Sequence, residues 1–356
     1  MYAGSNRMNE KTLEVLIDQT MGQCGSGINI TWQGGEPTLM GLDFFKRVVE
    51  LEAKYGRKKQ VSNNLQTNGL LLNTEWADFL NEYNFLVGLS LDGPEHIHDT
   101  YRKRRSRKGS FEKVHRSAKM LLERGVDTNI LSCITDYSSQ YAEEIYHFNK
   151  KIGVQFLQFI PIVETDKADP GVAAEFSVSA KAYGAFLSKI FDLWYHDFVS
   201  GNSPVSIRHI ESIFFRYVGF EAPECPLKEE CGTYLVVEHN GDVYPCDFFV
   251  EPAMKLGNIH KDRLIDMLNS SAMVNFGQMK MDLPSNCSSC KWKPFCYGGC
   301  TKDRVRDPRD KRNNHFCDSY QMFLEHAHPY LSELAKSWKE QNKARQQTYD
   351  ASGHFR

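Results

Sequence analysis

The cysteines constrain this chain more than any other feature, because eight of its ten lie between residues 225 and 317. Thiols concentrated in this way form disulfides, bind structural zinc or hold iron–sulfur clusters. The first residues contain no apolar signal segment, which disfavours a secreted disulfide framework. Eight thiolates make two sites of four, so the count fits two zinc ions or two cubane clusters equally well.

The spacing of these cysteines favours iron. Zinc ribbons usually pair two short CxxC knuckles, whereas this stretch has one, extended to C-x2-C-x5-C-x3-C and followed by a lone cysteine. Upstream, the residues around Gly241 read C-x9-G-x4-C. Zinc stays open as the alternative metal. The eight residues are Cys225, Cys231, Cys246, Cys287, Cys290, Cys296, Cys300 and Cys317.

Length and composition predict an ordinary globular protein. A chain of 356 residues can hold one large domain and a smaller one, and 41% of its residues are hydrophobic. A net charge of -2 leaves no electrostatic footprint for nucleic acid, and no apolar run is long enough to span a membrane. Ten cysteines without a secretory signal lead us to expect a reducing cytoplasm.

The first 205 residues alternate between strand and helix patterns, which predicts a parallel α/β sheet with right-handed crossovers. Helical periodicity begins at Asn9, a possible cap, and returns between the predicted strands. The predicted strands are Ile28–Gln33, Val61–Gln66, Phe85–Leu91, Thr128–Thr135 and Val154–Ile160. The predicted helices are Asn9–Met21, Leu42–Tyr55, Glu75–Asn81, Phe111–Arg124, Gln140–Lys151 and Lys181–Ser200.

The loops after these strands are where the chemistry of such folds gathers. The first loop reads Gln33-Gly34-Gly35-Glu36-Pro37, in which two glycines leave the backbone open and Glu36 could hold an ammonium group. The second strand ends in Asn-Gly and the third in Asp-Gly-Pro, and each of these is an ordinary turn when taken alone. Cys133, inside an apolar strand, is expected to be a buried small hydrophobe.

Together, these loops and the cysteine pattern resemble the radical S-adenosylmethionine (SAM) enzymes that carry a SPASM domain. Whole stretches, WQGGEPTLMGLDFF, LQTNGLLLN, FLVGLSLDGP, FLQFIP and VYPCDFF, resemble the anaerobic sulfatase-maturating enzymes from about residue 8 to residue 330. The resemblance implies an α/β fold, a partial (β/α)6 TIM-like barrel without its first strand, then a cysteine-rich SPASM domain. The expected divisions are residues 1–205, 206–335 and a polar tail, 336–356.

The resemblance also implies roles for individual residues. It places S-adenosylmethionine binding on Gly35, Ser90, Arg102 and Leu157, where the residues alone favour a turn glycine, a strand serine, a surface arginine and a core leucine. It makes Asp247 the proton acceptor, although a loop aspartate more commonly caps backbone amides. It implies two auxiliary [4Fe–4S] clusters, one held by Cys225, Cys231, Cys246 and Cys300, the other by Cys287, Cys290, Cys296 and Cys317.

A third cluster would need a CxxxCxxC loop, which this sequence does not contain. We expect codons upstream of Met1 to encode it within roughly forty residues, enough for a strand, the loop and a helix start. A degenerate family member is the alternative. Without the motif the chain is not expected to cleave S-adenosylmethionine.

The implied reaction oxidises a cysteine or serine of a sulfatase polypeptide to Cα-formylglycine, with Asp247 taking a proton and an auxiliary cluster accepting an electron. The implied partners are the sulfatase and an electron donor such as flavodoxin or ferredoxin, with no nucleic acid or membrane. Two other functions stay open. One is another SPASM enzyme that modifies peptides, for example by making thioether crosslinks, and the other is a non-catalytic iron–sulfur or zinc protein that binds a peptide.

Overall fold

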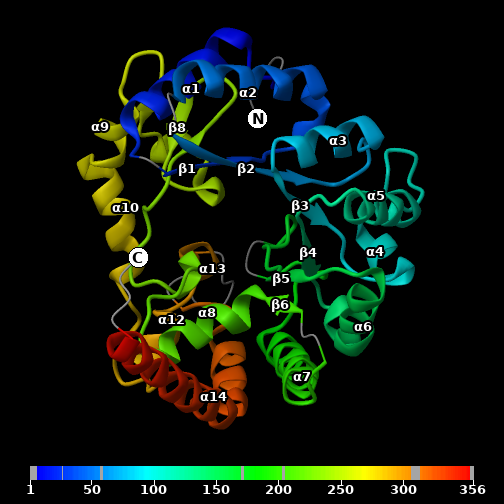
Figure 1. The fold of residues 1–356 in the computed structure, drawn as a ribbon, viewed down its shortest axis with the longest axis vertical. Helices are drawn as coiled ribbons and strands as arrows, with labels where there is room; N and C mark the ends of the chain where they lie inside the picture. The colour runs from blue at the N-terminus through cyan, green and yellow to red at the C-terminus, as the bar shows by residue number, and fades with distance from the viewer. Residues whose placement is uncertain are drawn as a thin grey trace. The chain divides into compact units, whose positions relative to one another are not determined.

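The computed structural model describes residues 6–25, 27–56, 59–169, 172–202, 205–305 and 313–352. Its main element is a six-stranded sheet whose strand order follows the chain (Figure 1). The strands are β1 (Gly27–Trp32), β2 (Gln60–Thr67), β3 (Leu86–Ser90), β4 (Thr128–Ile134), β5 (Phe156–Pro161) and β6 (Ser206–Ile207). The α/β class predicted from the sequence is confirmed.

The first four strands pair in parallel, with Ile28 opposite Val61 and Leu65 opposite Val87. Helices connect them, as the alternating pattern predicted, because parallel neighbours need a long crossover. The connecting helices are α2 (Leu42–Gly56), α3 (Thr74–Glu82), α4 (Glu95–Tyr101), α5 (Phe111–Glu123) and α6 (Ala142–Ile152). The short 3-10 helices are η1 (Pro37–Met40), η2 (Ser138–Tyr141), η3 (Cys225–Leu227), η4 (Asp247–Phe249) and η5 (Pro252–Met254).

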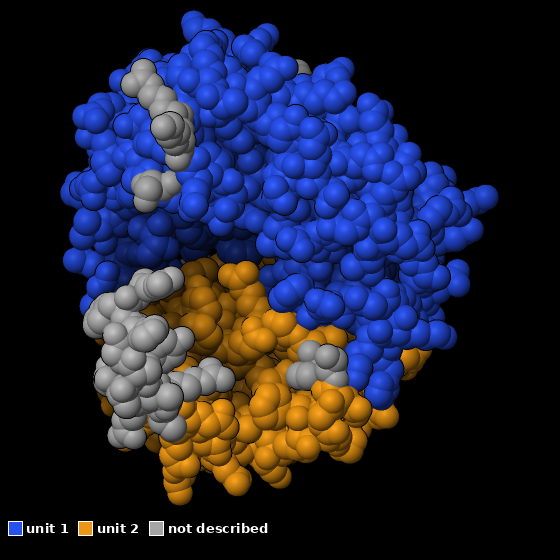
Figure 2. Space-filling model, in the orientation of Figure 1, with its two compact units in different colours: residues 1–133, 147–160, 230–281 blue, residues 134–146, 161–229, 282–356 orange. Residues whose placement is uncertain are grey.

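The chain packs into two compact units, coloured blue and orange in Figure 2. The first unit contains residues 1–133, 147–160 and 230–281, and the second contains residues 134–146, 161–229 and 282–356. Residues 230–281, which we expected in the second domain, therefore pack within the first unit. This division describes packing, so the domain boundaries given by the sequence stay a prediction.

In the first unit, α1 (Glu10–Gln23) joins the start of the chain to residues 230–281. Asn9 caps this helix as expected, since its side chain accepts the backbone N–H of Thr12 at 2.9 Å. Gln19 then donates to the carbonyl of Ile259 at 2.7 Å. A small antiparallel sheet and two helices complete this region: β7 (Val236–Val237), β8 (Asp242–Tyr244), β9 (Gly257–Asn258), α9 (Leu264–Leu268) and α10 (Ser271–Met281).

The second unit is built on two long helices, α7 (Ala180–Val199) and α14 (Cys317–Ser352). They approach closely at Gly184, where a Cβ would lie 3.1 Å from the Cα of Ser319. The helix α14 continues through most of the stretch predicted to be a tail, whose residues 353–356 lie outside the described part. The other helices are α8 (Arg208–Tyr217), α11 (Ser285–Ser288), α12 (Lys293–Cys296) and α13 (Thr301–Val305). Over the described ranges, no helix is long and apolar enough to cross a bilayer.

Candidate active site and cluster sites

The loop after β1 lines a cavity of about 930 Å³ within the first unit. A Cβ built at Gly35 would meet no atom within 4 Å, so its backbone faces open space. Gly34 has φ of +128°, a conformation that favours glycine. The segment 233–239, which includes Tyr234, lines the same cavity. A volume of this size is typical of a site for a small molecule, so the open backbone predicted at Gly35 is present.

Glu36 in this loop is a structural residue rather than a free carboxylate. Its Oε1 accepts hydrogen bonds from the backbone N–H and hydroxyl of Thr38 and from the hydroxyl of Thr67. Its Oε2 accepts the backbone N–H of Asn68 at 2.8 Å. The carboxylate thus joins the loop after β1 to the end of β2. The expectation that this carboxylate could hold an ammonium group stays a prediction.

Ser90 ends β3, and its hydroxyl accepts a hydrogen bond of 3.3 Å from the amide of Gln66 on β2. Gly88 makes room for this amide, since a Cβ at Gly88 would lie 2.1 Å from Gln66 Oε1. In the parallel pairing of β2 with β3, Gln66 lies directly opposite Gly88. The predicted ligand-binding serine therefore stands beside a second polar side chain, which the sequence did not single out.

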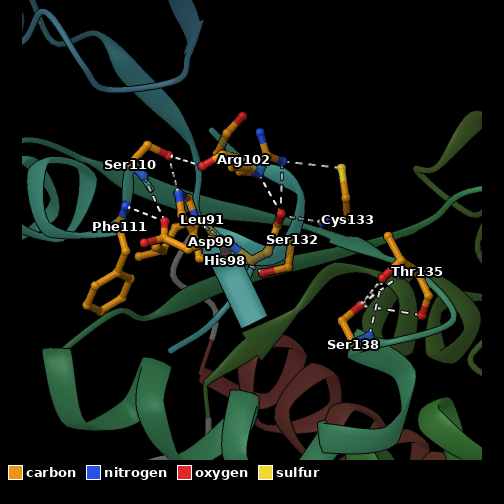
Figure 3. A network of polar contacts seen from close by, with 12 residues as sticks. Leu91, His98, Asp99, Arg102, Ser110, Phe111, Ser132, Cys133, Thr135 and Ser138 are labelled. Carbon is orange, nitrogen blue, oxygen red and sulfur yellow. Dashed lines mark hydrogen bonds and ion pairs between the residues drawn. The ribbon is translucent and has the colours of Figure 1, made fainter. Parts of the chain in front are cut away.

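Arg102 follows α4 and is joined to two neighbouring elements (Figure 3). Its Nε donates to Asp92 Oδ2 at 2.5 Å, and its Nη2 donates to Asp92 Oδ1 at 2.9 Å and to Cys133 Sγ at 3.3 Å. Burial alone would lower the pKa of the guanidinium, but the charge and hydrogen bonds of Asp92 raise it overall. The expectation for Cys133 was wrong, because its thiol is partly exposed and accepts this bond.

Leu157 lies in β5 and is 1% exposed. All four residues assigned to S-adenosylmethionine belong to the first unit. Of these four, Gly35 lines the cavity, whereas Ser90, Arg102 and Leu157 are not among its described lining residues. Their joint role in binding stays a prediction.

Asp247 begins η4 directly after Cys246 and is exposed. The hydroxyl of Tyr234 donates to Asp247 Oδ1 at 2.8 Å and lies 3.4 Å from Cys246 Sγ. Burial of the phenol, together with these two acceptors, raises the pKa of Tyr234 well above its usual range. The hydroxyl of Tyr234 is thus a hydrogen-bond donor to the predicted catalytic carboxylate. Nothing in the spacing of the sequence identifies Tyr234 as a site residue.

In the second unit, four cysteines line one cavity of about 330 Å³. They come from α11, α12, the turn between these helices and the first residue of α14. They are Cys287, Cys290, Cys296 and Cys317, the set that the resemblance assigned to one cluster. Among the residues that the structure describes, no three His, Cys, Asp or Glu side chains lie close enough together to hold a single metal ion. Four thiols around a cavity of this size suit a multi-iron cluster better than zinc.

The thiols of this cavity influence one another electrostatically. Burial raises the pKa of Cys296 to about 11, and nearby Cys317, Cys287 and Cys290 raise it further. Burial also raises the pKa of Cys287, while Arg304 and Lys293 oppose the rise. The pKa of both thiols is raised overall, so without iron they are protonated, and iron would have to displace these protons on binding. The number and identity of the donors fit a four-cysteine cluster.

The other four cysteines are divided between the two units. Cys231 and Cys246 belong to the first, and Cys225 and Cys300 belong to the second. Burial raises the pKa of Cys300 to about 12, and Cys225 is near enough to contribute to this rise. Gly298 and Gly299, directly before Cys300, have φ of +74° and +67°, which glycine adopts without strain and which turns the chain tightly there. Their assignment to one cluster stays a prediction.

Two family models match the chain. Residues 3–148 match the radical SAM superfamily, and residues 225–291 match the SPASM iron–sulfur cluster-binding domain. The serine-type anaerobic sulfatase-maturating enzyme of Bacteroides thetaiotaomicron is 37% identical over 350 residues, covering 92% of this chain and 83% of that protein. The cysteine-type enzyme of Clostridium novyi is 36% identical over 332 residues, covering 93% and 88%.

The chain is also similar in structure to solved proteins. The chain is similar to native anSMEcpe with bound AdoMet and Cp18Cys peptide, with a TM-score of 0.87 and 34% identity over 93% of this chain and 91% of that one. Streptococcus suis SuiB bound to S-adenosylmethionine has a TM-score of 0.55 at 17% identity, over 87% and 69%, and therefore shares the fold alone.

Proposed function

This chain belongs to the family of anaerobic sulfatase-maturating enzymes, and we propose that it oxidises a cysteine or serine of a sulfatase polypeptide to Cα-formylglycine. It is a radical SAM oxidoreductase, and its two domain matches imply [4Fe–4S] clusters and S-adenosylmethionine. The single observation that carries the proposal is the hydrogen bond from Tyr234 to Asp247 beside Cys246, because it orients a carboxylate next to a predicted cluster ligand.

When bound, the cofactors would supply the radical chemistry that removes a hydrogen atom from the substrate Cβ. We assign one auxiliary cluster to the four cysteines around the second-unit cavity. The remaining cysteines, Cys225, Cys231, Cys246 and Cys300, would hold the other. Thiolate ligands of this kind persist in a reducing compartment, so we place the enzyme in the cytoplasm.

The residues of the first unit would bind the cofactor by their own chemistry. The open backbone of Gly35 allows a ligand to approach closely. Ser90 and Arg102 offer a hydroxyl and a guanidinium to its oxygens. The resemblance alone assigns the apolar wall to Leu157, which is 1% exposed. The structural roles of these four residues are compatible with this binding, which is what supports the assignment.

Asp247 would take the thiol or hydroxyl proton of the substrate as its Cβ is oxidised. Tyr234 holds Oδ1 of this carboxylate, and within the described residues Oδ2 makes no hydrogen bond. The exposed Oδ2 can accept a proton, and the hydrogen bond to Oδ1 fixes the orientation of the carboxylate. An electron donor such as flavodoxin or ferredoxin would complete the cycle.

Asp247→Asn tests this assignment in the protein expressed from its complete reading frame and loaded with iron. General-base catalysis is typically worth ~10²–10⁴ in rate, so formation of the aldehyde on a sulfatase peptide should fall by about that factor. Release of 5′-deoxyadenosine precedes this step and should survive far better. Two peptides that differ only in cysteine or serine at the target position would identify the substrate type.

The ratio of the two products decides the outcome. If 5′-deoxyadenosine and aldehyde fall together, Asp247 shapes the site instead of taking the proton. If neither falls, Asp247 is an ordinary loop residue. A thioether crosslink in place of the aldehyde would favour a different SPASM peptide-modifying enzyme.

A further inference from the structure

The guanidinium of Arg102 is held on one side only. Asp92 accepts from Nε and Nη2, and Cys133 Sγ accepts the second hydrogen of Nη2 (Figure 3). Within the part of the chain that the structure describes, the two N–H groups of Nη1 make no hydrogen bond. The Arg102 side chain is 26% exposed, so one end of an otherwise fixed guanidinium is open to a ligand.

Asp92 is itself fixed. It lies two residues beyond β3 and is 6% exposed, and its Oδ1 also accepts the backbone N–H of Cys133 at 2.9 Å. A carboxylate with one oxygen already bonded to the backbone of β4 cannot turn freely. The orientation of Arg102 is therefore set by the sheet through Asp92.

The backbone between these two residues is held by a chain of hydrogen bonds (Figure 3). The N–H of Asp92 donates to His98 Nδ1 at 3.3 Å, His98 Nε2 lies 2.9 Å from Ser110 Oγ, and Ser110 donates to the carbonyl of Arg102 at 2.8 Å. Burial lowers the pKa of His98 to about 4, so the ring is neutral and donates from Nε2 alone. Both ends of the segment are thus anchored.

We propose that Asp92 is a positioning residue that directs Nη1 of Arg102 toward an oxygen of S-adenosylmethionine. Asp92 already accepts hydrogen bonds from Nε and Nη2, so the bidentate edge of the guanidinium is not available to the ligand. The ligand therefore meets the guanidinium end-on, at Nη1. Asp92 also cancels the charge of Arg102, which suits a ligand that carries a sulfonium cation. The inference rests on the proposed function, since it takes S-adenosylmethionine as the ligand.

The test is a double-mutant cycle on S-adenosylmethionine binding, measured by equilibrium dialysis with the cluster-loaded protein expressed from its complete reading frame. The four proteins are wild type, Asp92→Asn, Arg102→Ala and the double variant. Asp92→Asn should raise Kd about tenfold in the wild-type background, since it loosens a charge-assisted pair. It should add nothing once Arg102 is alanine, because Asp92 acts through that residue.

Asp99→Asn is the matched control. Asp99 lies in the same segment, but its Oδ1 accepts the backbone N–H groups of Ser110 and Phe111 at 2.8 Å and not a guanidinium N–H, and asparagine keeps this acceptor oxygen. Its Kd should match that of the wild type. Three results would each overturn the proposal. In the first, Asp92→Asn leaves Kd unchanged. In the second, it raises Kd by the same factor in the Arg102→Ala background, and in the third, Asp99→Asn raises Kd as much as Asp92→Asn does.

A kinetic measurement separates this proposal from the proposed function. In peptide oxidation, Asp92→Asn should raise KM for S-adenosylmethionine and leave KM for the peptide unchanged. The dialysis contains no peptide. A protein that binds S-adenosylmethionine with the expected cycle but oxidises no sulfatase peptide would refute the proposed function and leave the role of Asp92 standing.

Discussion

Glu52 on α2 should make the first unit less stable as the pH rises. Glu52 is 8% exposed, its Oε2 accepts a hydrogen bond from Asn63 at 2.9 Å, and among the described residues Oε1 has no partner. Trp32 in turn donates to Asn63 at 2.8 Å. Burial raises the pKa of Glu52 from 4.5 to about 7, and the bond from Asn63 only partly opposes this. The folded state therefore favours the neutral acid.

The sign and size of the effect follow from linkage. A carboxyl group whose pKa is raised by folding stabilises the protein fully below its unfolded pKa, and this stability is lost as the pH rises through the folded pKa. A rise from 4.5 to about 7, at about 1.36 kcal/mol for each pKa unit, amounts to about 3 kcal/mol. The loss should begin near the pKa of a free glutamate and be complete above neutral pH.

The assay is urea unfolding of the iron-free chain at about pH 5 and about pH 8, comparing the wild type with Glu52→Gln. Glutamine keeps the shape of the neutral acid, so between these two pH values the variant should lack about 2.5 kcal/mol of the pH-dependent loss. Glu50→Gln on the same helix is the control, because Glu50 is exposed and pairs with Arg47 at the surface. If the wild type and Glu52→Gln lose equal stability, Glu52 ionises without cost and the reasoning is refuted.

Three further predictions concern the sites. Tyr234→Phe removes the hydroxyl that orients the carboxylate beside it, so aldehyde formation should fall about tenfold while release of 5′-deoxyadenosine persists; equal loss of both would contradict the role. Cys290→Ala should leave the protein with about four fewer irons, whereas Cys24→Ala, outside the cysteine-rich stretch, should keep the full content. Gly88→Ala should displace the amide of Gln66 and weaken S-adenosylmethionine binding, and unchanged binding would exclude that amide from the site.

Much of the fold could be predicted because its signals are local. The five predicted strands and the capped first helix are all present, since period-two and helical patterns depend only on nearby residues. The strand β6 was missed because two residues, Ser206–Ile207, show no periodicity. The packing of residues 230–281 on α1 was also missed, because it depends on contacts such as Gln19 with Ile259, far apart in the chain.

The candidate site divides in the same way. The GGEP loop and the cysteines could be located because their spacing is written in the sequence. The partners that fix the site residues could not be located from the sequence, because these contacts form only when the chain folds. Asp92 binds Arg102, and Tyr234 binds Asp247. For the same reason the sequence could not show the partners of Glu36 that come from the end of the next strand.

The most direct test of the account is aldehyde formation on a sulfatase peptide by the cluster-loaded protein expressed from its complete reading frame. The reaction contains S-adenosylmethionine and a reductant, and mass spectrometry identifies the target residue before and after hydrazide trapping. We predict a trappable aldehyde at the target cysteine or serine that disappears when S-adenosylmethionine is left out. An unmodified target residue in both peptides, from protein with its full iron content and measurable release of 5′-deoxyadenosine, would contradict the account.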